Sequence, residues 1–404
     1  MKVAIIGGGA AGFFAAIAAK KNHPQAQVVI LEKSKKLLSK VKISGGGRCN
    51  VTNGCTNIKD LANAYPRGGK KLKQAFRLFN TQHTVEWFES RGVPLFVEAD
   101  GRVFPISQSS QTVIDCLLKE TTQRGITIEI QKGVKAIFPQ EGKLELQFSK
   151  PIFPNAIFDK VIIATGGSPR RKGLEWLENL GHQIEEPVPS LFTFNMPQEK
   201  ITELMGIVVE QTLVSIQGTK LKSNGPLLIT HWGMSGPAIL KLSAFGARIL
   251  NEMNYEFKVQ VNWVNELNHE VVLRKIKNII TIHARKYLAN VRPYALKERL
   301  WSYLLEKCKL SPQKRWEELG KKGVNKLVNI LTNDVYEVNG KTTFKEEFVT
   351  CGGVSLESID FKTMQSKAVP NLYFTGEVMD IDGITGGYNF QAAWTTAVIA
   401  GALK

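Results

Sequence analysis

Glycine-rich segments hold the residue types and spacings in this sequence that could do chemistry. The first is Gly7-x-Gly9-x-x-Gly12, followed twenty residues later by Glu32. Glycines at this spacing let the main chain turn tightly beside a pyrophosphate, and an acidic side chain at that distance can accept a hydrogen bond from a ribose hydroxyl. The pattern predicts a dinucleotide-binding site.

The elements expected around these glycines are those that such a site requires. Val3 to Ile6 suits a buried strand, Phe13 to Lys20 suits a helix, and Gln27 to Leu31 suits a second strand. The free N–H groups of the helix N-terminus would face the phosphates. A secretory signal is the alternative, because Lys2 precedes an apolar stretch, but glycines would interrupt it and Glu32 would be left unexplained. We therefore predict a strand-helix-strand nucleotide unit.

Three later glycine loops carry polar side chains. The first runs from Ser44 to Asn53 and contains three consecutive glycines, which let the main chain pass close to a flat or anionic ligand. The second follows the apolar run Val161 to Ala164 with Thr-Gly-Gly, a pattern typical of flavin-binding proteins. The third, from Gly376, leads to a helix expected over Asn389 to Leu403, whose N-terminus would favour negative charge on a reduced flavin. The C-terminal segment thus completes the N-terminal domain.

The charge of the chain is unusual. Its 404 residues include 53 Lys+Arg and 36 Asp+Glu, which gives a net charge of +17. Such an excess favours a polyanionic partner, nucleic acid before membrane, although a basic proteome background is the alternative. The excess is concentrated in a loop expected over Lys33 to Lys42 and in the span from Glu252 to Lys326.

The cysteines and the hydropathy of the sequence limit the class of protein that this chain can be. The five cysteines include no CxxC spacing, so neither a disulfide framework nor a zinc site is indicated. A reducing cytoplasm is the compartment we expect. No apolar stretch approaches the length of a membrane span, and no membrane partner is expected.

The chain changes character at Pro187, where we expect an inserted domain. Strands are expected over 127–130, 135–138 and 144–148 as a meander, and over 192–196, 208–216 and 225–229 in the insert; helices are expected over 112–125, 266–287 and 293–308. The predicted domains are a flavin domain from 1–188 and 343–404, a β-rich insert from 189–264 and 328–342, and a helical insert from 265–327.

A further glycine loop, Thr230 to Leu240, enters a helix within the insert. Ser235 is a plausible cap for that helix and Pro237 suits its first position. His231 in the same loop could pack in the core or face a ligand.

Four motifs carry a resemblance over nearly the whole chain: Ser44 to Asn53, Thr230 to Leu240, Thr350 to Val354 and Gly376 to Gln391. Together they resemble the bacterial BaiN/RdsA family of NAD(P)/FAD-dependent oxidoreductases. The resemblance implies an α/β fold: a discontinuous FAD-binding domain of the two-dinucleotide-binding, glutathione-reductase-like type, with a β-rich insert and a helical insert. It also implies reduction of carbon-carbon double bonds, in bile-acid intermediates or in uridine of 23S ribosomal RNA. Cys351 departs from the small residue expected there.

Both substrates present an alkene conjugated to a carbonyl. Flavin can deliver hydride to the β carbon, and an acid must protonate the α carbon. Cys49 beside Arg48 is the first candidate acid, since a nearby cation can poise a thiol, and a small buried filler is the alternative. His231 and Tyr388 are the next candidates.

The cofactor implied is non-covalent FAD. No second glycine fingerprint with its strand-helix-strand context occurs, so NAD(P)H would visit only as a transient electron donor. The expected cofactor-binding residues are Gly7, Gly9, Ala10, Ala11, Gly12, Glu32, Lys33, Ser44, Gly45, Gly46, Arg48, Cys49, Asn50, Val134, Thr165, Gly166, Gly167, Gly376, Glu377, Asp382, Gly386, Gly387, Tyr388 and Asn389.

The excess of basic residues lets us rank the possible substrates. Structured RNA offers many dispersed phosphates, whereas a steroid or bile-acid-like molecule needs one or two cations. We therefore expect ribosomal RNA uridine first, a small-molecule enone second, and a non-catalytic flavin-bound RNA-binding protein third.

Overall fold

The computed structural model describes residues 1–342 and 349–404. The chain forms two compact units: unit 1 comprises Met1–Ser190 and Phe344–Lys404, and unit 2 comprises Leu191–Thr343. The expected return to the first domain at residue 343 therefore falls outside the described residues. None of the helices in the described ranges combines the length and the apolar character that a membrane span needs.

Unit 1 is built on a mostly parallel sheet. In the described residues its strand order is β20-β21-β22-β10-β1-β2-β6, with β22, β10, β1, β2 and β6 parallel to one another. The strands are β1 (Lys2–Ile6), β2 (Gln27–Leu31), β6 (Thr127–Glu129), β10 (Lys160–Ile163), β20 (Ile359–Asp360), β21 (Gln365–Ser366) and β22 (Leu372–Phe374). The C-terminal strand β22 pairs with β10, so the predicted discontinuous α/β fold is confirmed.

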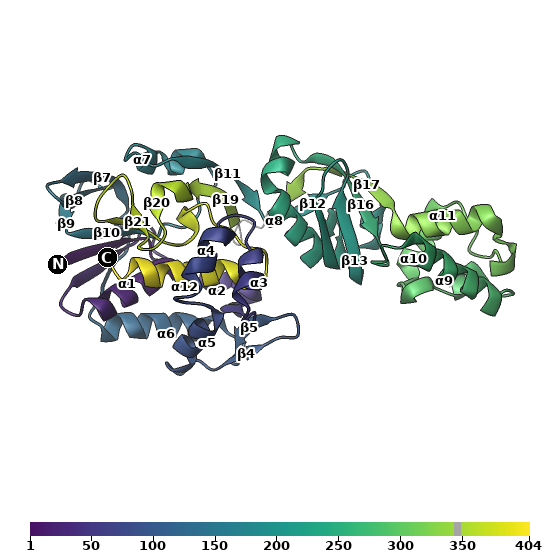
Figure 1. The fold of residues 1–404 in the computed structure, drawn as a ribbon, viewed down its shortest axis with the longest axis horizontal. Coiled ribbons are helices and arrows are strands. Elements are labelled where there is room, and N and C mark those ends of the chain that lie inside the picture. Colours follow the sequence, from purple (N-terminus) through teal and green to yellow (C-terminus); the bar gives the residue numbers. More distant parts are fainter. Residues whose placement is uncertain (343–348) are drawn as a thin grey trace. The chain divides into compact units, whose positions relative to one another are not determined.

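Two helices of small residues pack together beside this sheet (Figure 1). They are α1 (Ala10–Asn22) and α12 (Tyr388–Ala400), and most of both is buried. A Cβ added at Gly401 would lie 2.6 Å from the Cβ of Ala18, so the small side chains allow the close approach. The packing joins the first and last parts of the chain.

Smaller elements complete unit 1. Its other sheets contain β3 (Thr52–Asn53), β4 (Leu95–Val97) and β5 (Arg102–Pro105); β7 (Val134–Gln140), β8 (Lys143–Phe148) and β9 (Ala156–Phe158); and β11 (Ile184–Ser190) with β19 (Val349–Val354). Its other helices are α2 (Ser39–Gly47), α3 (Ile58–Asn63), α4 (Gly69–Ala75), α5 (Thr81–Glu89), α6 (Ser110–Gln123) and α7 (Glu175–Glu178), with short 3-10 turns at Arg171–Gly173, Leu356–Ser358 and Gly376–Val378.

Two expectations for unit 1 were wrong. The strand expected over 127–130 does not belong to the meander, because β6 pairs with β2 in the main sheet and the meander is β7-β8-β9. The basic segment expected as a loop over Lys33 to Lys42 is helical from Ser39, where α2 begins. The partner of a short strand of alternating polarity cannot be predicted from the strand's own residues, because strand pairing depends on residues far away in the sequence.

Unit 2 contains an antiparallel sheet and a group of helices that share one hydrophobic core. The sheet order is β17-β16-β13-β14-β15-β12-β18 within the described residues. The strands are β12 (Thr193–Asn195), β13 (Val208–Ile216), β14 (Lys222–Thr230), β15 (Gly233–Ser235), β16 (Glu256–Asn262), β17 (Asp334–Asn339) and β18 (Lys341–Thr342); the helices are α8 (Pro237–Glu252), α9 (His269–Ile282), α10 (Glu298–Lys307) and α11 (Gly320–Thr332), with 3-10 turns at Lys200–Leu204, Leu288–Asn290, Pro293–Ala295 and Trp316–Glu318.

Two helices of unit 2 are shorter than expected, since α9 and α10 replace the helices expected over 266–287 and 293–308. Trp301 and Trp316 are fully buried and stacked, with ring centroids 6.3 Å apart. Trp301 Nε1 donates to the main-chain oxygen of Leu288, in the segment between the two helices, at 2.7 Å. Ser235 is not a cap, because it lies in β15 and the N-cap of α8 is Gly236. Pro237 occupies the first helical position as predicted.

Candidate functional site

The glycine motifs of unit 1 meet at the end of the parallel sheet. A Cβ at Gly7 would lie 2.3 Å from the main-chain oxygen of Ala164, just before the loop that contains Thr165 and Gly166. A Cβ at Gly376 would lie 2.8 Å from that of Ala11. The start, middle and end of the chain are therefore in close contact here. They approach each other at glycines, where any side chain would clash.

The N-terminus of α1 has the features of a phosphate site. No side chain caps the helix, and its first turn has no acidic residue. A Cβ at Gly9 would meet no protein atom within 4 Å, whereas one at Gly12 would lie 1.9 Å from the oxygen of Gly7. Gly12 is thus required by the protein's own packing, while the space beside Gly9 is open. An uncapped helix end beside open space fits a pyrophosphate.

Glu32 lies beside this turn at the end of β2. Its carboxylate accepts hydrogen bonds from the N–H groups of Gly8 and Ser34, both at 2.8 Å. The next residue, Lys33, is close to the start of β7, since a Cβ at Gly133 would lie 2.9 Å from the Cβ of Lys33. The predicted pair Lys33 and Val134 is therefore brought together next to Glu32, where the adenosine part of a dinucleotide would lie.

Residues 44–47, at the C-terminal end of α2, form a loop that departs from helical geometry. Ser44 has left the helical conformation, and Gly45, Gly46 and Gly47 have φ values of 59°, 68° and 85°. A Cβ at Gly45 would lie 2.8 Å from the ring of Phe104, but at Gly46 and Gly47 it would meet nothing within 4 Å. The loop therefore presents bare main chain to open space, which a flat ring system can approach.

This loop contacts the N-terminus of α12. A Cβ at Gly387 would lie 2.2 Å from the oxygen of Thr52 and 2.8 Å from the amide oxygen of Asn50. The side chain of Asn53 donates to the oxygen of Gly386 at 2.9 Å. No side chain caps α12, so its first N–H groups are available to a ligand. The arrangement fits an isoalloxazine whose reduced form carries negative charge.

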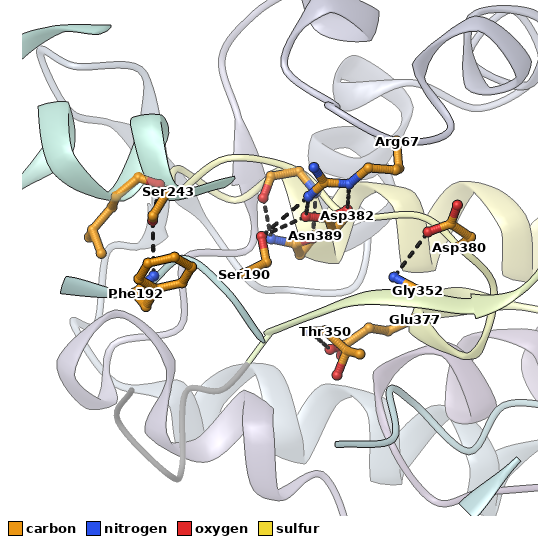
Figure 2. A network of polar contacts seen from close by, with 12 residues as sticks. Arg67, Ser190, Phe192, Ser243, Thr350, Gly352, Glu377, Asp380, Asp382 and Asn389 are labelled. Atoms are coloured by element: carbon orange, nitrogen blue, oxygen red, sulfur yellow. Dashed lines mark hydrogen bonds and ion pairs between the residues drawn. The ribbon is translucent and has the colours of Figure 1, made fainter. Parts of the chain in front are cut away.

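Glu377 connects the middle and the end of the chain. Its carboxylate accepts from the N–H of Thr350 at 3.0 Å (Figure 2). It also pairs with Lys40 at 2.7 Å. A Cβ at Gly167 would lie 2.6 Å from both Glu377 Oε1 and Thr350 Oγ1. The hydroxyl of Thr350 is buried without a hydrogen-bond partner among the described residues. A buried polar atom of this kind is what a bound ligand would satisfy.

Asp382, an expected cofactor contact, has a carboxylate that is engaged within the protein. Its buried carboxylate forms a two-pronged ion pair with Arg67, with one contact of 2.5 Å to Arg67 Nε, and accepts from Ser190 Oγ at 2.6 Å (Figure 2). Burial raises the pKa of Asp382, and the charge of Arg67 opposes that rise. Because both oxygens are engaged within the protein, the side chain secures the loop before α12.

Asn389 secures the same loop from the helix side. Its amide accepts from the N–H of Gly383 at 2.8 Å and donates to the oxygen of Gly383 at 3.0 Å. The two bonds fix the main chain at Gly383 against the first turn of α12. We infer that this side chain positions the loop, while the main chain of residues 386–389 remains the surface for a cofactor.

Arg48 and Cys49 do not form the pair that the sequence suggested. The guanidinium of Arg48 binds Glu98 at 2.8 Å and lies 4.0 Å from the ring centre of Phe104. The thiol of Cys49 is fully buried, and burial raises its pKa to about 12 despite a hydrogen bond from Ser44. The expected poising of this thiol by a cation is therefore not what the structure has.

Tyr388 begins α12 and is held by Tyr65. The Tyr65 hydroxyl donates to the main-chain oxygen of Tyr388 at 2.6 Å, and the two rings meet edge to face with centroids 6.0 Å apart. The Tyr388 side chain is half-buried, and its hydroxyl has no hydrogen-bond partner among the described residues. Burial, with a smaller contribution from the neighbouring Cys55 thiol, raises its pKa to about 12.

His231, the third candidate acid, belongs to unit 2. It lies in the turn between β14 and β15, and its side chain is exposed. Its ring meets that of Trp232 edge to face at 4.3 Å, and Trp232 Nε1 donates to Thr193 Oγ1 at 3.1 Å. His231 is thus not a core residue, which was one of its two expected environments.

Sequence reasoning missed several residues of this region. Tyr65 and Ser190 occur in no glycine motif, Thr350 stands at the start of its motif but was not expected as a site residue, and Arg67 lies in a basic stretch that resembles ordinary solvated surface. Each acquires its role from a partner more than a hundred residues away or from burial. The only signal that could have found them is the fold itself.

Comparisons with known proteins agree with this geometry. Residues 1–403 match the family model described as the HI0933-like protein Rossmann domain. The chain is 30% identical over 382 residues to a ribosomal RNA dihydrouridine synthase of Escherichia coli, covering 92% of this chain and 90% of the relative. It is 28% identical over 417 residues to a 3-dehydro-bile acid delta(4,6)-reductase of Clostridium scindens, covering 99% and 98%.

A solved structure shares the fold. It is the 3-ketosteroid delta1-dehydrogenase of Sterolibacterium denitrificans, with a TM-score of 0.51 and 11% sequence identity, covering 99% of this chain and 98% of that one. The uncapped helix ends, the open space beside Gly9 and the unpartnered hydroxyl of Thr350 fit FAD. The chain belongs to the HI0933-like family, also known as BaiN/RdsA, and is an FAD-dependent oxidoreductase with a Rossmann-type cofactor domain.

Proposed function

We propose that this oxidoreductase reduces a uridine of 23S ribosomal RNA to dihydrouridine, with electrons from NAD(P)H. The observation that carries the choice of substrate is a basic segment at residues 271–297. It contains seven lysines and arginines, all with exposed side chains, and no acidic residue. Such a surface is suited to many phosphates, and a substrate with a single negative charge does not require it.

The relatives support the same substrate. Proteins named ribosomal RNA dihydrouridine synthase are 30% identical to the chain in Escherichia coli and 27% identical in Haemophilus influenzae. Each alignment covers 92% of this chain and 90% of the relative. It therefore spans unit 2, which carries the basic segment, as well as unit 1. Whole-length similarity favours a shared substrate class over a shared cofactor domain alone.

The chemistry needs a hydride at the β carbon and a proton at the α carbon of the conjugated alkene. Reduced FAD, when bound, supplies the hydride. The protein must hold the substrate against the flavin and supply the proton. We place Tyr388 first as the proton donor, because its hydroxyl is half-buried, unpartnered among the described residues and at the uncapped end of α12.

The other two candidates rank lower for stated reasons. Cys49 is fully buried, so a substrate would reach its thiol only if the loop from Ser44 to Asn50 moved. His231 belongs to unit 2, whereas the residues described above as the cofactor site belong to unit 1. Measured turnover of the variants tests this order.

The test is analysis of ribosomal RNA. Cells that lack the protein should lose one dihydrouridine of 23S RNA, seen as the return of a uridine two mass units lighter. The purified protein, loaded with FAD and supplied with NADH or NADPH, should restore it. Unchanged dihydrouridine in the deletion strain would contradict the proposal.

A small-molecule enone is the second candidate substrate. It is favoured by the relative named 3-dehydro-bile acid delta(4,6)-reductase, which the chain matches over 99% of its length. Rapid mixing of the reduced protein with a steroid enone would distinguish the two. Fast reoxidation of the flavin with a saturated product, and no change in RNA, would favour this candidate.

A further inference from the structure

We propose that Tyr287 of unit 2 is a stacking platform for an unpaired RNA base, flanked by cations that contact the adjoining phosphates. The inference rests on the proposed function and deepens it, because it assigns a particular surface to the RNA. Tyr287 is 44% exposed, and it follows Arg285 and Lys286 in the sequence. Single-stranded RNA is held in this way, by aromatic rings against bases and by cations against the backbone.

A second basic segment lies directly beside Tyr287. The main chain of Leu288 donates to the oxygen of Lys314 at 2.9 Å, and that of Trp316 donates to the oxygen of Lys286 at 3.1 Å. Tyr287 and Arg315 are therefore directly opposite as an antiparallel pair. The two hydrogen bonds are made by the neighbouring residues, so Tyr287 and Arg315 form a non-hydrogen-bonded pair. In such a pair the two side chains project from the same face of the ladder and lie closer together than in a hydrogen-bonded pair.

The cations around Tyr287 are available to a ligand. Arg285, Lys286 and Lys314 have no ion-pair partner among the described residues. Arg315 has one weak, exposed pairing, with Glu317 at 3.8 Å. An exposed pair of this kind is easily exchanged for a phosphate, because it contributes little stability.

The platform is rigid because the core of unit 2 lies beneath it. Leu288 and Trp316, the neighbours of the pair, are fully buried. Trp301 Nε1 donates to the oxygen of Leu288 at 2.7 Å and fixes the main chain from below. A ring carried on a fixed main chain loses little conformational entropy on binding, which suits it to stacking.

The chemistry favours RNA over a membrane surface. Among the described residues of unit 2, Tyr287 is the exposed large apolar residue farthest toward the C-terminus. The one before it in the sequence is Ile282. A peripheral membrane anchor needs a continuous apolar face, whereas the apolar residues Val272 and Ile276 of the preceding helix are turned into the core. A single ring among cations fits a base and its phosphates.

The test is binding of two RNA probes to the full, flavin-loaded protein over a series of salt concentrations. The probes are a single-stranded uridine-rich oligoribonucleotide and a blunt RNA duplex of equal length. Tyr287→Ala should weaken single-strand binding roughly 5- to 150-fold without changing its dependence on salt, because stacking releases no counterions. Tyr287→Phe, which keeps the ring, should bind like the wild type.

Two controls separate stacking from charge and from damage to the fold. Lys286→Gln should weaken binding to both probes and reduce the salt slope by about 0.7 to 0.9, the value of one phosphate contact. Phe138→Ala removes an equally exposed ring, 45% exposed, that lies opposite Glu145 in unit 1, and it should change nothing. The flavin spectrum and thermal midpoint should be the same in all variants.

The outcomes also distinguish this inference from the proposed function. If the wild type reduces uridine but Tyr287→Ala binds the single strand as well as the wild type does, the platform is wrong and the function stands. If Tyr287 supports single-strand binding but no dihydrouridine forms, the function is wrong and the platform stands. Binding to phosphatidylserine vesicles in place of RNA would overturn the platform.

Discussion

The hydroxyl of Tyr65 donates a 2.6 Å hydrogen bond to the main-chain oxygen of Tyr388, the first residue of α12. The bond fixes the point at which the chain turns from the glycine loop into the helix. The Tyr388 hydroxyl itself has no protein partner among the described residues, and no side chain caps the first N–H groups of α12. One turn of the chain thus carries both an uncapped helix end and the half-buried tyrosine proposed above as the proton donor.

The first prediction concerns Tyr388. Tyr388→Phe should retain FAD and accept electrons but form product roughly 10²- to 10⁴-fold more slowly, because only the proton donor is lost. Rapid-mixing kinetics would separate the two half-reactions. Cys49→Ala is the matched comparison, and we expect it to keep most of its turnover because the thiol is buried. The reverse result would move the acid role to Cys49.

The pH dependence of product formation gives a second prediction. Burial raises the pKa of Tyr388 to about 12, so the neutral hydroxyl, which is the donating form, persists well above neutrality. The oxidative half-reaction should therefore be insensitive to pH over the neutral and mildly alkaline range, and should fall only as pH approaches 12. A fall in rate within the mildly alkaline range would contradict Tyr388 as the donor.

The third prediction separates cofactor contact from packing in the first glycine motif. Gly9→Val should fold normally and lose FAD, because its Cβ enters space that the protein leaves open. Gly12→Ala should destabilise the protein even without FAD, since its Cβ would lie 1.9 Å from the oxygen of Gly7. Flavin absorbance and thermal unfolding of FAD-free protein measure the two effects. Full FAD occupancy in Gly9→Val would contradict the assignment.

The buried ion pair of Arg67 and Asp382 gives the fourth prediction. Asp382→Asn should lower the free energy of unfolding by about 3–5 kcal/mol, because it removes the buried negative charge that faces the mostly buried Arg67 guanidinium. It should also weaken FAD binding through the loop before α12. Glu357→Gln is the control: it breaks an exposed pair with Lys71 and should cost less than about 1 kcal/mol in urea denaturation.

The fifth prediction tests the basic segment as a whole. Joint reversal of charge at Lys275, Lys277 and Arg285 should weaken RNA binding and flatten its dependence on salt, because fewer counterions are released. The flavin spectrum should not change, since the three residues belong to unit 2. Electrophoretic or anisotropy titrations at several salt concentrations would measure the effect. Undiminished RNA affinity would leave the charge of this segment unexplained.

Local sequence determined the nucleotide-binding unit and its place in the chain. The run Val3 to Ile6, the glycines that follow it and Glu32 lie within about 30 residues, and their spacing alone dictates a strand, a tight turn and a helix. The excess of cations is likewise a property of composition. Family resemblance extended this to FAD and to a domain made of two distant segments.

Tertiary structure decided the use of individual side chains. Asp382 and Arg48 looked like ligand contacts, yet each is engaged by a partner 315 or 50 residues away. Cys49 looked reactive, yet folding buries it. Tyr287 looked like the end of a helix, and only the tertiary structure pairs it with Arg315. Burial and long-range partners set the pKa and the availability of a side chain, and neither can be derived from the residues next to it in sequence.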